Sequence, residues 1–331
     1  MIEKIIEDFG KFNIFVLGDI VLDKYLFGET NYISQEAPVP IVKATHDKYV
    51  LGGAANVAMN FKKANCNVWL AGVVGHDKHG SQISDLIKKH NINPVLAYDF
   101  GRITTVKKRV ICQNQQMIRI DYESTDDVDI GLLDKYVFDV MRSIDIDAIV
   151  IADYNKGVLH DKVISKVLEL AHEKNIFIAI DPKIKNFALY NNVDLFKPNI
   201  KEFFIHYSRY EKNFDNLVKL VPQFAMKLNI SNMIVTMGGN GITAYNGKNL
   251  FHVPALNKTE VYDVTGAGDT VITYIVLSLL SNLSLVEASI VASVAAALKI
   301  RHLGAGPIDI EELKAKLINF DEYKKLVNKI I

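Results

Sequence analysis

Short apolar runs alternate with longer amphipathic segments along most of the chain, a pattern that predicts strands alternating with helices. The runs contain four to seven residues and stop close to glycine or polar residues, as buried parallel strands do. They cover residues 13–17, 68–74, 148–152, 176–180, 193–196 and 232–236. Helices are expected at 161–174 and from residues 268, 284 and 309, with a hairpin around Asn246-Gly247. This alternation predicts an α/β fold with a doubly wound, mostly parallel sheet.

Two segments depart from this alternation and have the pattern of a second, smaller sheet. Residues 24–50 and 102–122 alternate apolar and polar positions with a period of two, which is the period of a strand. Pro38 and Pro40 exclude a helix in the first segment. Because the two segments flank a strand and a helix of the main domain, we expect them to form a small β-sheet lid over it.

One glycine-rich turn leads directly into the most apolar helix expected in the chain. Gly266, Ala267 and Gly268 precede Asp269, and residues 271–280 are mostly apolar. The first N–H groups of a helix have no partner within it and attract an anion such as a phosphoryl group. Asp269 would repel that anion unless it acts as a general base for an attacking hydroxyl. The alternative, that Asp269 only caps the helix, is equally compatible with this segment alone.

Polar residues also follow the first predicted strand and begin the next helix. Asp19 and Asp23 come at or beyond the end of the strand, where open α/β sheets bind their ligands, so we expect them to bind hydroxyl groups. Gly52, Gly53 and Asn56 open the following helix, where small residues allow a ligand to approach the backbone. Tight packing of this helix on the sheet would explain the small residues almost as well.

Composition narrows the class of protein. A chain of 331 residues suits one large α/β domain with a small appendage, and 38 basic residues balance 38 acidic ones. This balance offers no electrostatic surface for nucleic acid or an anionic membrane, so neither is expected as a partner. Cys66 and Cys112 lack the spacing of a metal site, and the chain lacks the pattern of a signal peptide. We therefore expect a cytoplasmic protein.

Missing motifs exclude several other classes of enzyme. No Gly-x-Gly-x-x-Gly turn follows a predicted strand, which argues against a dinucleotide oxidoreductase. No P-loop sequence, nucleophile elbow or His-Glu-x-x-His motif is present either. His76 and His79 open a predicted helix without a third metal ligand nearby, so a surface turn is the favoured interpretation.

Two signatures occur together in this chain: Gly-Gly-Ala-Ala-Asn at 52–56 and Asp-Val-Thr-Gly-Ala-Gly-Asp at 263–269, about 210 residues later. With them the chain resembles the ribokinase-like (PfkB) carbohydrate kinases over nearly its whole length. The segments at 18–23, 33–40, 114–121, 153–157, 181–183 and 261–270 are similar to members of the family that phosphorylate D-glycero-D-manno-heptose 7-phosphate. The resemblance implies one ribokinase-like kinase domain over residues 1–331, with no cytidylyltransferase domain.

The resemblance also implies an activity and a set of site residues. The expected reaction transfers a phosphoryl group from ATP, with Mg²⁺, to the anomeric C1 hydroxyl of the heptose 7-phosphate, giving the 1,7-bisphosphate of lipopolysaccharide-precursor synthesis. Asp269 is then the base, and Gly266, Ala267 and Gly268 form the anion hole. The residues implied for ATP and Mg²⁺ are Asn199, Glu202, Thr236, Gly238, Gly241 and Ser293, of which Asn199 and Glu202 hold the metal through water. The residues implied for the sugar phosphate are Asp19, Asp23, Gly52, Gly53, Asn56, Asn60, Lys107, Arg109, Arg119, Asp153 and Lys156.

Several points stay open at the level of sequence. Ser293 stands where relatives commonly have Asn near the adenine, and a monovalent-cation requirement cannot be read. Lys107 and Arg109 could belong to an ordinary solvated strand face instead of a phosphate site. The alternatives to a heptose kinase are another sugar or sugar-phosphate kinase of the family and a catalytically silent binding protein. Pairing of two lids makes a homodimer the expected oligomer.

Overall fold

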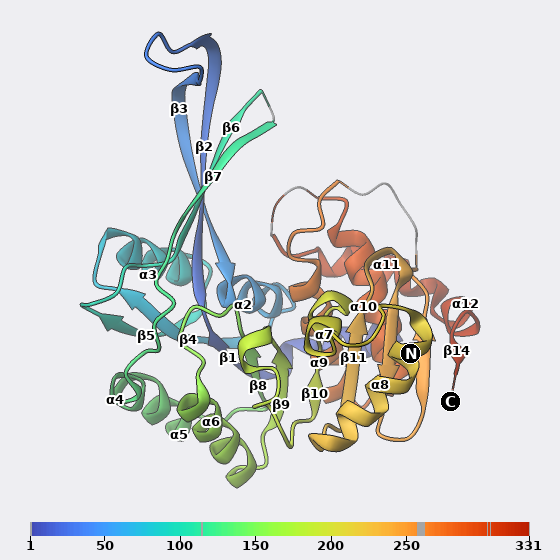
Figure 1. The fold of residues 1–331 in the computed structure, drawn as a ribbon. Helices are drawn as coiled ribbons and strands as arrows, with labels where there is room; N and C mark the ends of the chain where they lie inside the picture. Colours follow the sequence, from blue (N-terminus) through green and yellow to red (C-terminus); the bar gives the residue numbers. More distant parts are fainter. Residues whose placement is uncertain (1, 114, 257–261, 303, 305, 331) are drawn as a thin grey trace.

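A mixed α/β architecture with a large and a small sheet is seen in the computed structural model, which describes residues 2–113, 115–256, 262–302, 304 and 306–330. Asn114 and Val261, which belong to two of the segments quoted above, lie outside the described residues. The large sheet has the strand order β14-β13-β12-β11-β10-β9-β8-β1-β4-β5 (Figure 1). Its strands are β1 (Asn13–Gly18), β4 (Asn67–Gly75), β5 (Asn93–Asp99), β8 (Ala148–Ala152), β9 (Phe177–Asp181), β10 (Leu195–Phe196), β11 (Asn232–Thr236), β12 (Ile242–Tyr245), β13 (Leu250–Val253) and β14 (Asn328–Lys329).

In this sheet β11, β10, β9, β8, β1, β4 and β5 pair in parallel in that order. Strands β12, β13 and β14 extend the sheet antiparallel beyond β11. This confirms the predicted mostly parallel sheet and the hairpin of β12 and β13. Strands β5 and β14 were not predicted, because β5 carries Asn93, Pro94 and Tyr98 among its apolar residues and β14 has only two residues.

Helices cover both faces of the large sheet because its strands alternate between two apolar cores. In β1, Ile14 and Val16 join one core, and Phe15 and Leu17 join the other. The first core is closed by α1 (Ile2–Glu7), α2 (Ala54–Lys63), α3 (Lys78–Lys89), α9 (Ala267–Leu280), α10 (Leu285–Lys299), α11 (Ile310–Lys316) and α12 (Phe320–Lys325). The second is closed by α4 (Ile130–Leu133), α5 (Asp139–Ser143), α6 (Asp161–Glu173), α7 (Ile200–His206) and α8 (Phe214–Lys227). None of the helices in the described part of the chain is both long and apolar enough to cross a membrane.

The small sheet forms an arm that projects from the body (Figure 1). Its strands are β2 (Ile20–Ile33), β3 (Pro40–Gly53), β6 (Val106–Cys112) and β7 (Gln115–Tyr122), in the order β3-β2-β6-β7. Strands β2 and β6 pair in parallel, which places Asp23 beside Lys107 and Tyr25 beside Arg109. The outer part of the arm exposes apolar side chains, with Tyr32 and Ile33 more than 70% exposed. The predicted second sheet is therefore present, and it is longer than a simple cover.

One glycine fixes how closely β1 and β8 approach at the edge where the site is built. A Cβ atom placed on Gly18 would lie 2.0 Å from the carbonyl oxygen of Ala152, the neighbouring residue in β8. The obstacle is backbone, so no side chain can move to make room. The loops that leave the two strands, with Asp19 and Asp153, are held together by this contact.

We expect Gly18→Ala to destabilise the protein strongly, because the added methyl group must separate two paired strands at the centre of the sheet. A loss of at least about 2 kcal/mol in the free energy of unfolding is expected, measured by denaturant titration. Gly131→Ala is the matched control, since a Cβ at Gly131 in α4 meets only side-chain atoms of Asp129 at 3.5 Å or more. Equal stability of the two variants would contradict this interpretation of Gly18.

Candidate active site

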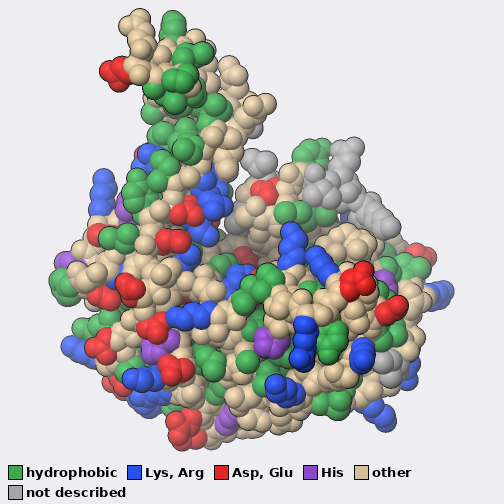
Figure 2. Space-filling model, in the orientation of Figure 1, with side chains coloured by type: hydrophobic (Ala, Val, Ile, Leu, Met, Phe, Trp, Pro, Cys, Tyr) green, Lys and Arg blue, Asp and Glu red, His purple; other side chains and the backbone are tan. Residues whose placement is uncertain are grey.

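A cavity of about 750 Å³ lies where the carboxyl ends of the parallel strands meet the base of the arm and the start of α9. Figure 2 shows a hollow in this region with Lys and Arg side chains beside it. Residues from both sheets and from α2, α7 and α9 contribute to its wall. Those that the sequence had indicated are Asp23, Gly52, Gly53, Asn56, Lys107, Arg109, Asp153, Asn199, Glu202, Thr236, Gly238, Gly266, Gly268 and Asp269.

Seven of the expected site residues are not among those that line this cavity: Asp19, Asn60, Arg119, Lys156, Gly241, Ala267 and Ser293. Asp19 is buried, and its carboxylate accepts hydrogen bonds from the backbone N–H groups of Tyr154, Lys156 and Val158. Burial, with the nearby charge of Asp153, raises the pKa of Asp19 to about 6. Asp19 therefore holds a loop, which corrects the expectation that it faces a sugar.

Asn60 is also buried and also has a structural position. Its amide donates to the carbonyl of Asn56 at 2.8 Å, and its carbonyl oxygen accepts from the hydroxyl of Thr270 at 3.2 Å. These bonds tie helix α2 to helix α9. Sequence could not separate this role from sugar binding, because Asn56 and Asn60 lie one helical turn apart and only the depth of burial distinguishes them.

Arg119 and Lys156 lie outside the cavity wall and have other partners. Arg119 is half exposed on β7 and forms an ion pair with Asp121 at 3.0 Å. The ammonium of Lys156 contacts the carboxylate of Glu123 at 2.7 Å. Neither contact contributes a cation to the cavity, so Lys107 and Arg109 are the cations that the described residues of the arm supply there.

Gly241 and Ser293 make structural contacts and do not line the cavity. Gly241 has φ of 86°, and a Cβ there would lie 2.2 Å from the carbonyl oxygen of Val253, so the turn needs glycine for steric reasons. The hydroxyl of Ser293, on α10, accepts a hydrogen bond from the backbone N–H of Leu256. This bond ties α10 to the segment that follows β13.

The start of α9 presents backbone donors to the cavity. Gly266 occupies the N-cap position with φ of 79°, a left-handed conformation that favours glycine. The N–H of Ala267 donates back to the carbonyl of Val264 at 3.2 Å, so it is not available to a ligand as the sequence had suggested. The N–H groups of Gly268 and Asp269 belong to the first helical turn, where the helix itself supplies no acceptor. These two amides and the dipole of α9 give this end of the cavity the donors and the partial positive charge that suit an anion.

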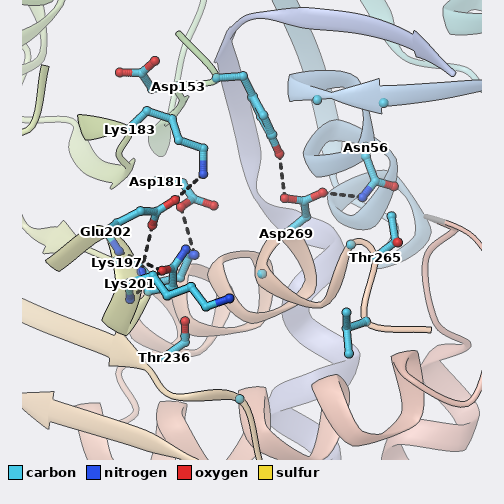
Figure 3. Close-up of a pocket in the computed structure, with 18 of the residues that line it drawn as sticks. Asn56, Asp153, Asp181, Lys183, Lys197, Lys201, Glu202, Thr236, Thr265 and Asp269 are labelled. Carbon is cyan, nitrogen blue, oxygen red and sulfur yellow. Dashed lines mark hydrogen bonds and ion pairs between the residues drawn. The ribbon is translucent and has the colours of Figure 1, made fainter. Parts of the chain in front are cut away.

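Asp269 holds its carboxylate between two donors on the cavity wall (Figure 3). The amide of Asn56 donates to one oxygen at 2.5 Å, and the hydroxyl of Tyr154 donates to the other at 2.8 Å. Asp269 keeps part of its surface open to the cavity although protein atoms surround most of the carboxylate. Burial raises the pKa of Asp269, while these two hydrogen bonds and the lysines nearby lower it.

Two lysines and two carboxylates form a charged cluster opposite Asp269, at the ends of β9 and β10 and the start of α7 (Figure 3). Lys197 is 3% exposed and pairs with Asp181 at 2.9 Å, and Lys183 pairs with Glu202. Burial raises the pKa of Asp181 to about 6, and the two lysines oppose this shift. A Cβ on Gly268 would lie 3.7 Å from the ammonium nitrogen of Lys197, which puts this cation at the mouth of α9.

Asp181, Lys183 and Lys197 were not proposed as site residues from the sequence. The available signal was their position, because each lies at or just beyond the carboxyl end of a parallel strand, where such sheets bind ligands. Tyr154 was also missed, and the same signal was available for it, because it lies in the loop that follows β8.

Asn199 and Glu202 organise the start of α7 as a capping box. The side chain of Asn199 accepts from the N–H groups of Lys201 and Glu202, and the carboxylate of Glu202 accepts from the N–H of Asn199. The remaining oxygen of Glu202 faces Lys183. No group of three or more His, Cys, Asp or Glu side chains suited to a metal ion occurs among the described residues. Asn199 and Glu202 together suit a Mg²⁺ ion that keeps its water ligands and is bound mainly by nucleotide phosphates.

The arm closes the opposite side of the cavity with positive charge. The guanidinium of Arg109 donates to the carboxylate of Asp23 at 2.5 Å and lies over the ring of Tyr25. Lys107 comes from the same strand, and burial lowers its pKa. The guanidinium of Arg109 can bind a phosphate group with two parallel hydrogen bonds, and the ammonium of Lys107 can bind it as a point charge. The alternative that they form a solvated strand face is not supported, because both line the cavity and are partly buried.

A helix mouth, an adjacent carboxylate and paired lysines at the ends of parallel strands are the features of a phosphoryl-transfer enzyme. Residues 11–312 match the family described as pfkB family carbohydrate kinase. The chain belongs to this family of carbohydrate kinases, as its resemblance had indicated.

Curated relatives refine this assignment. The chain is 38% identical over 304 residues to the bifunctional protein HldE of Helicobacter pylori (strain Shi470), covering 91% of this chain and 65% of the relative. It is 36% identical over 329 residues to the protein of that name from Helicobacter acinonychis (strain Sheeba), covering 94% and 70%. The chain thus spans about two thirds of the length of the curated relatives it matches.

Solved structures agree on the fold. A tetrameric inhibited form of phosphofructokinase-2 from Escherichia coli has a TM-score of 0.78 and 17% identity, covering 93% of this chain and 99% of that one. A putative sugar kinase from Clostridium perfringens has a TM-score of 0.71 and 19% identity, covering 97% and 98%. At these identities the likeness concerns the fold alone, and it confirms the ribokinase-like class.

We expect Lys197→Met to destabilise the protein in a pH-dependent way, because it leaves Asp181 without its closest cation. The expected loss is about 2 kcal/mol at pH 8. The pKa of Asp181 is already raised to about 6 in the folded protein, so its ionisation disfavours the fold as the pH rises through that value. Without Lys197 this penalty grows, and the stability difference from the unchanged protein should be larger at pH 8 than at pH 5.

The measurement is denaturant unfolding at both pH values, with Lys201→Met as the control. Lys201 is exposed in the first turn of α7, four residues after Lys197, so its loss should change stability by less than about 0.5 kcal/mol. The double variant Lys197→Met/Asp181→Asn should recover part of the loss. A pH-independent loss that the second change does not reduce would contradict the assigned pairing.

Proposed function

We propose that this protein is an ATP-dependent kinase that phosphorylates the anomeric C1 hydroxyl of D-glycero-D-manno-heptose 7-phosphate and yields the 1,7-bisphosphate. The observation that carries the proposal is the Asp269 carboxylate, held at the mouth of α9 in a cavity whose far side offers Lys107 and Arg109. The similarity to HldE proteins and the resemblance of segments 33–40 and 114–121 to heptose-phosphate kinases support this sugar over others. The product would enter ADP-heptose and lipopolysaccharide-precursor synthesis in the cytoplasm.

The proposed reaction begins with the sugar phosphate bound across the cavity. Lys107 and Arg109 receive the 7-phosphate, and Asp23, Asn56 and Asp153 contact sugar hydroxyls. The C1 hydroxyl then lies against Asp269. Because phosphate competes with Asp23 for Arg109, binding would loosen an ion pair that is present in the free protein.

Transfer follows when Asp269 takes the proton of the C1 hydroxyl. The sugar oxygen forms a bond to the terminal phosphorus of ATP, and the bond from that phosphorus to the bridging oxygen breaks, so ADP leaves with the electron pair. The N–H groups of Gly268 and Asp269, with Lys197 beside them, stabilise the charge on the migrating group.

The nucleotide would occupy the part of the cavity lined by Asn199, Thr236 and Gly238, with Gly241 shaping the turn. Asn199 and Glu202 would hold Mg²⁺ through its water molecules. When bound, the metal neutralises phosphate charge and aligns the terminal phosphoryl group. Lys183, which pairs with Glu202 in the free protein, lines the same part of the cavity and would contact a phosphate oxygen.

The closest alternative is another sugar or sugar-phosphate kinase of the same family. A substrate panel with ATP and Mg²⁺ distinguishes them: heptose 7-phosphate should give the highest kcat/KM, and ribose, fructose and fructose 6-phosphate should be poorer substrates. A higher kcat/KM with any of those three would overturn the proposed substrate. In the same assay Asp269→Asn should lower turnover at least about a hundredfold with little loss of sugar binding. Unchanged turnover would remove Asp269 from the mechanism.

We also propose that two copies pair through their arms, because the outer arm exposes Tyr32, Ile33 and Ile41 without covering them in one chain. Analytical ultracentrifugation should therefore report a dimer. Ile33→Lys/Ile41→Lys should shift the protein toward monomer. Ile318→Lys is the control, because Ile318 is 72% exposed on the body, far along the chain from the arm, and its loss should leave the dimer intact. A monomer at micromolar concentration in the unchanged protein would contradict arm pairing.

A further inference from the structure

Tyr154 lines the cavity and contacts the carboxylate of Asp269, and it has no part in the reaction as described so far. It lies in the loop after β8, and its hydroxyl donates to one oxygen of Asp269 at 2.8 Å. Asn56, from α2, donates to the other oxygen, so each carboxylate oxygen has one protein donor. An ionised carboxylate oxygen accepts more than one hydrogen bond, which leaves room for a substrate hydroxyl.

The loop that carries Tyr154 is held in place by hydrogen bonds from its backbone to a buried side chain. The carboxylate of Asp19, buried beneath the loop, accepts from the backbone N–H groups of Tyr154, Lys156 and Val158 at 2.8, 3.1 and 3.2 Å. Gly157 has φ of 85°, and a Cβ there would lie 1.9 Å from the carbonyl oxygen of Asp126. These contacts restrict the loop to one backbone conformation, which fixes the position of the Tyr154 hydroxyl.

We propose that Tyr154 is a positioning residue for phosphoryl transfer: its hydroxyl orients the carboxylate of Asp269 toward the acceptor and favours the ionised form that can take a proton. Asp19 acts one step further away, by holding the loop. This inference rests on the proposed role of Asp269 as the base. It also accounts for Asp19, which follows β1 and whose carboxylate accepts three hydrogen bonds from the backbone of the Tyr154 loop.

The charged surroundings of Asp269 set the direction of the expected effect. Lys183 and Lys197 face it from the ends of β9 and β10, and both lower its pKa. Asp181 and, from α10, Lys299 also interact with its charge, with opposite signs. Burial of the carboxylate raises the pKa, and the bonds from Asn56 and Tyr154 oppose this. Loss of the Tyr154 hydroxyl removes one stabilising donor and leaves the other groups in place, so the pKa of Asp269 must rise.

Tyr154→Phe tests this with two readouts. Carbon-13 NMR of carboxyl-labelled aspartate, with the Asp269 signal assigned by its loss in Asp269→Asn, should show the pKa of Asp269 higher by about one unit. The acid limb of the pH profile of kcat should move to higher pH by the same amount. At pH values below the pKa of Asp269 kcat should fall up to about tenfold, and at pH values well above it kcat should approach that of the unchanged enzyme. KM for the sugar should change less than about twofold.

Tyr245→Phe is the matched control. Tyr245 is buried on β12 and donates its hydroxyl to the backbone carbonyl of Gly247, so the variant removes a comparable bond outside the cavity. It should leave the Asp269 pKa and the acid limb unchanged. An equal pKa of Asp269 in Tyr154→Phe and the unchanged protein would overturn the inference, as would a kcat that rises together with a lower KM, which would mean that the hydroxyl only occupies the acceptor's place.

The kinetic readout uses whichever sugar phosphate of the substrate panel is turned over. A preference for a sugar other than heptose 7-phosphate would overturn the proposed substrate and leave the inference on Tyr154 standing. If no sugar phosphate is turned over, the proposed function fails, and the NMR titration still decides whether Tyr154 controls the ionisation of Asp269.

Discussion

A carboxylate placed beside an anion-binding helix start is the constraint on which this site depends. Left alone, Asp269 would repel the phosphate that the first turn of α9 attracts, and burial would favour its neutral form. Two hydrogen bonds, from Asn56 and Tyr154, and two lysines across the cavity oppose both effects. These contacts favour the ionised carboxylate at the position where, in the proposed reaction, a hydroxyl loses its proton beside the migrating phosphate.

The topology explains why these groups meet although they are far apart in the sequence. Parallel strands β1, β8, β9 and β10 all point their carboxyl ends toward one edge, so each following loop can add a side chain to the same cavity. The arm leaves the body between β1 and α2 and returns after β5, which brings its cations over that edge. Lys197 pairs with Asp181 and Lys183 pairs with Glu202. The four charges of this cluster therefore sum to zero.

Much of the fold could be predicted from apolar periodicity, but burial depth could not. Runs such as Ala148–Ala152 and Asn232–Thr236 show clear strand patterns, and their bounds were predicted as they occur. Asp269 was indicated by the glycine-rich turn before an apolar helix, and Asn199 and Glu202 by the resemblance to the kinase family; all three line the cavity. Asp19 and Asn60 have the same local pattern as ligand-binding residues, and only three-dimensional packing shows that backbone amides and Thr270 occupy them. Lys197 was missed because its partner, Asp181, comes from a different strand.

The most direct test is a crystal structure of the protein with a non-hydrolysable ATP analogue, Mg²⁺ and heptose 7-phosphate. The expected result is a C1 hydroxyl within hydrogen-bonding distance of the Asp269 carboxylate, with the terminal phosphate of the analogue on the N–H groups of Gly268 and Asp269. A sugar bound with Asp269 facing only protein atoms, or a terminal phosphate bound away from the start of α9, would contradict the mechanism derived for this site.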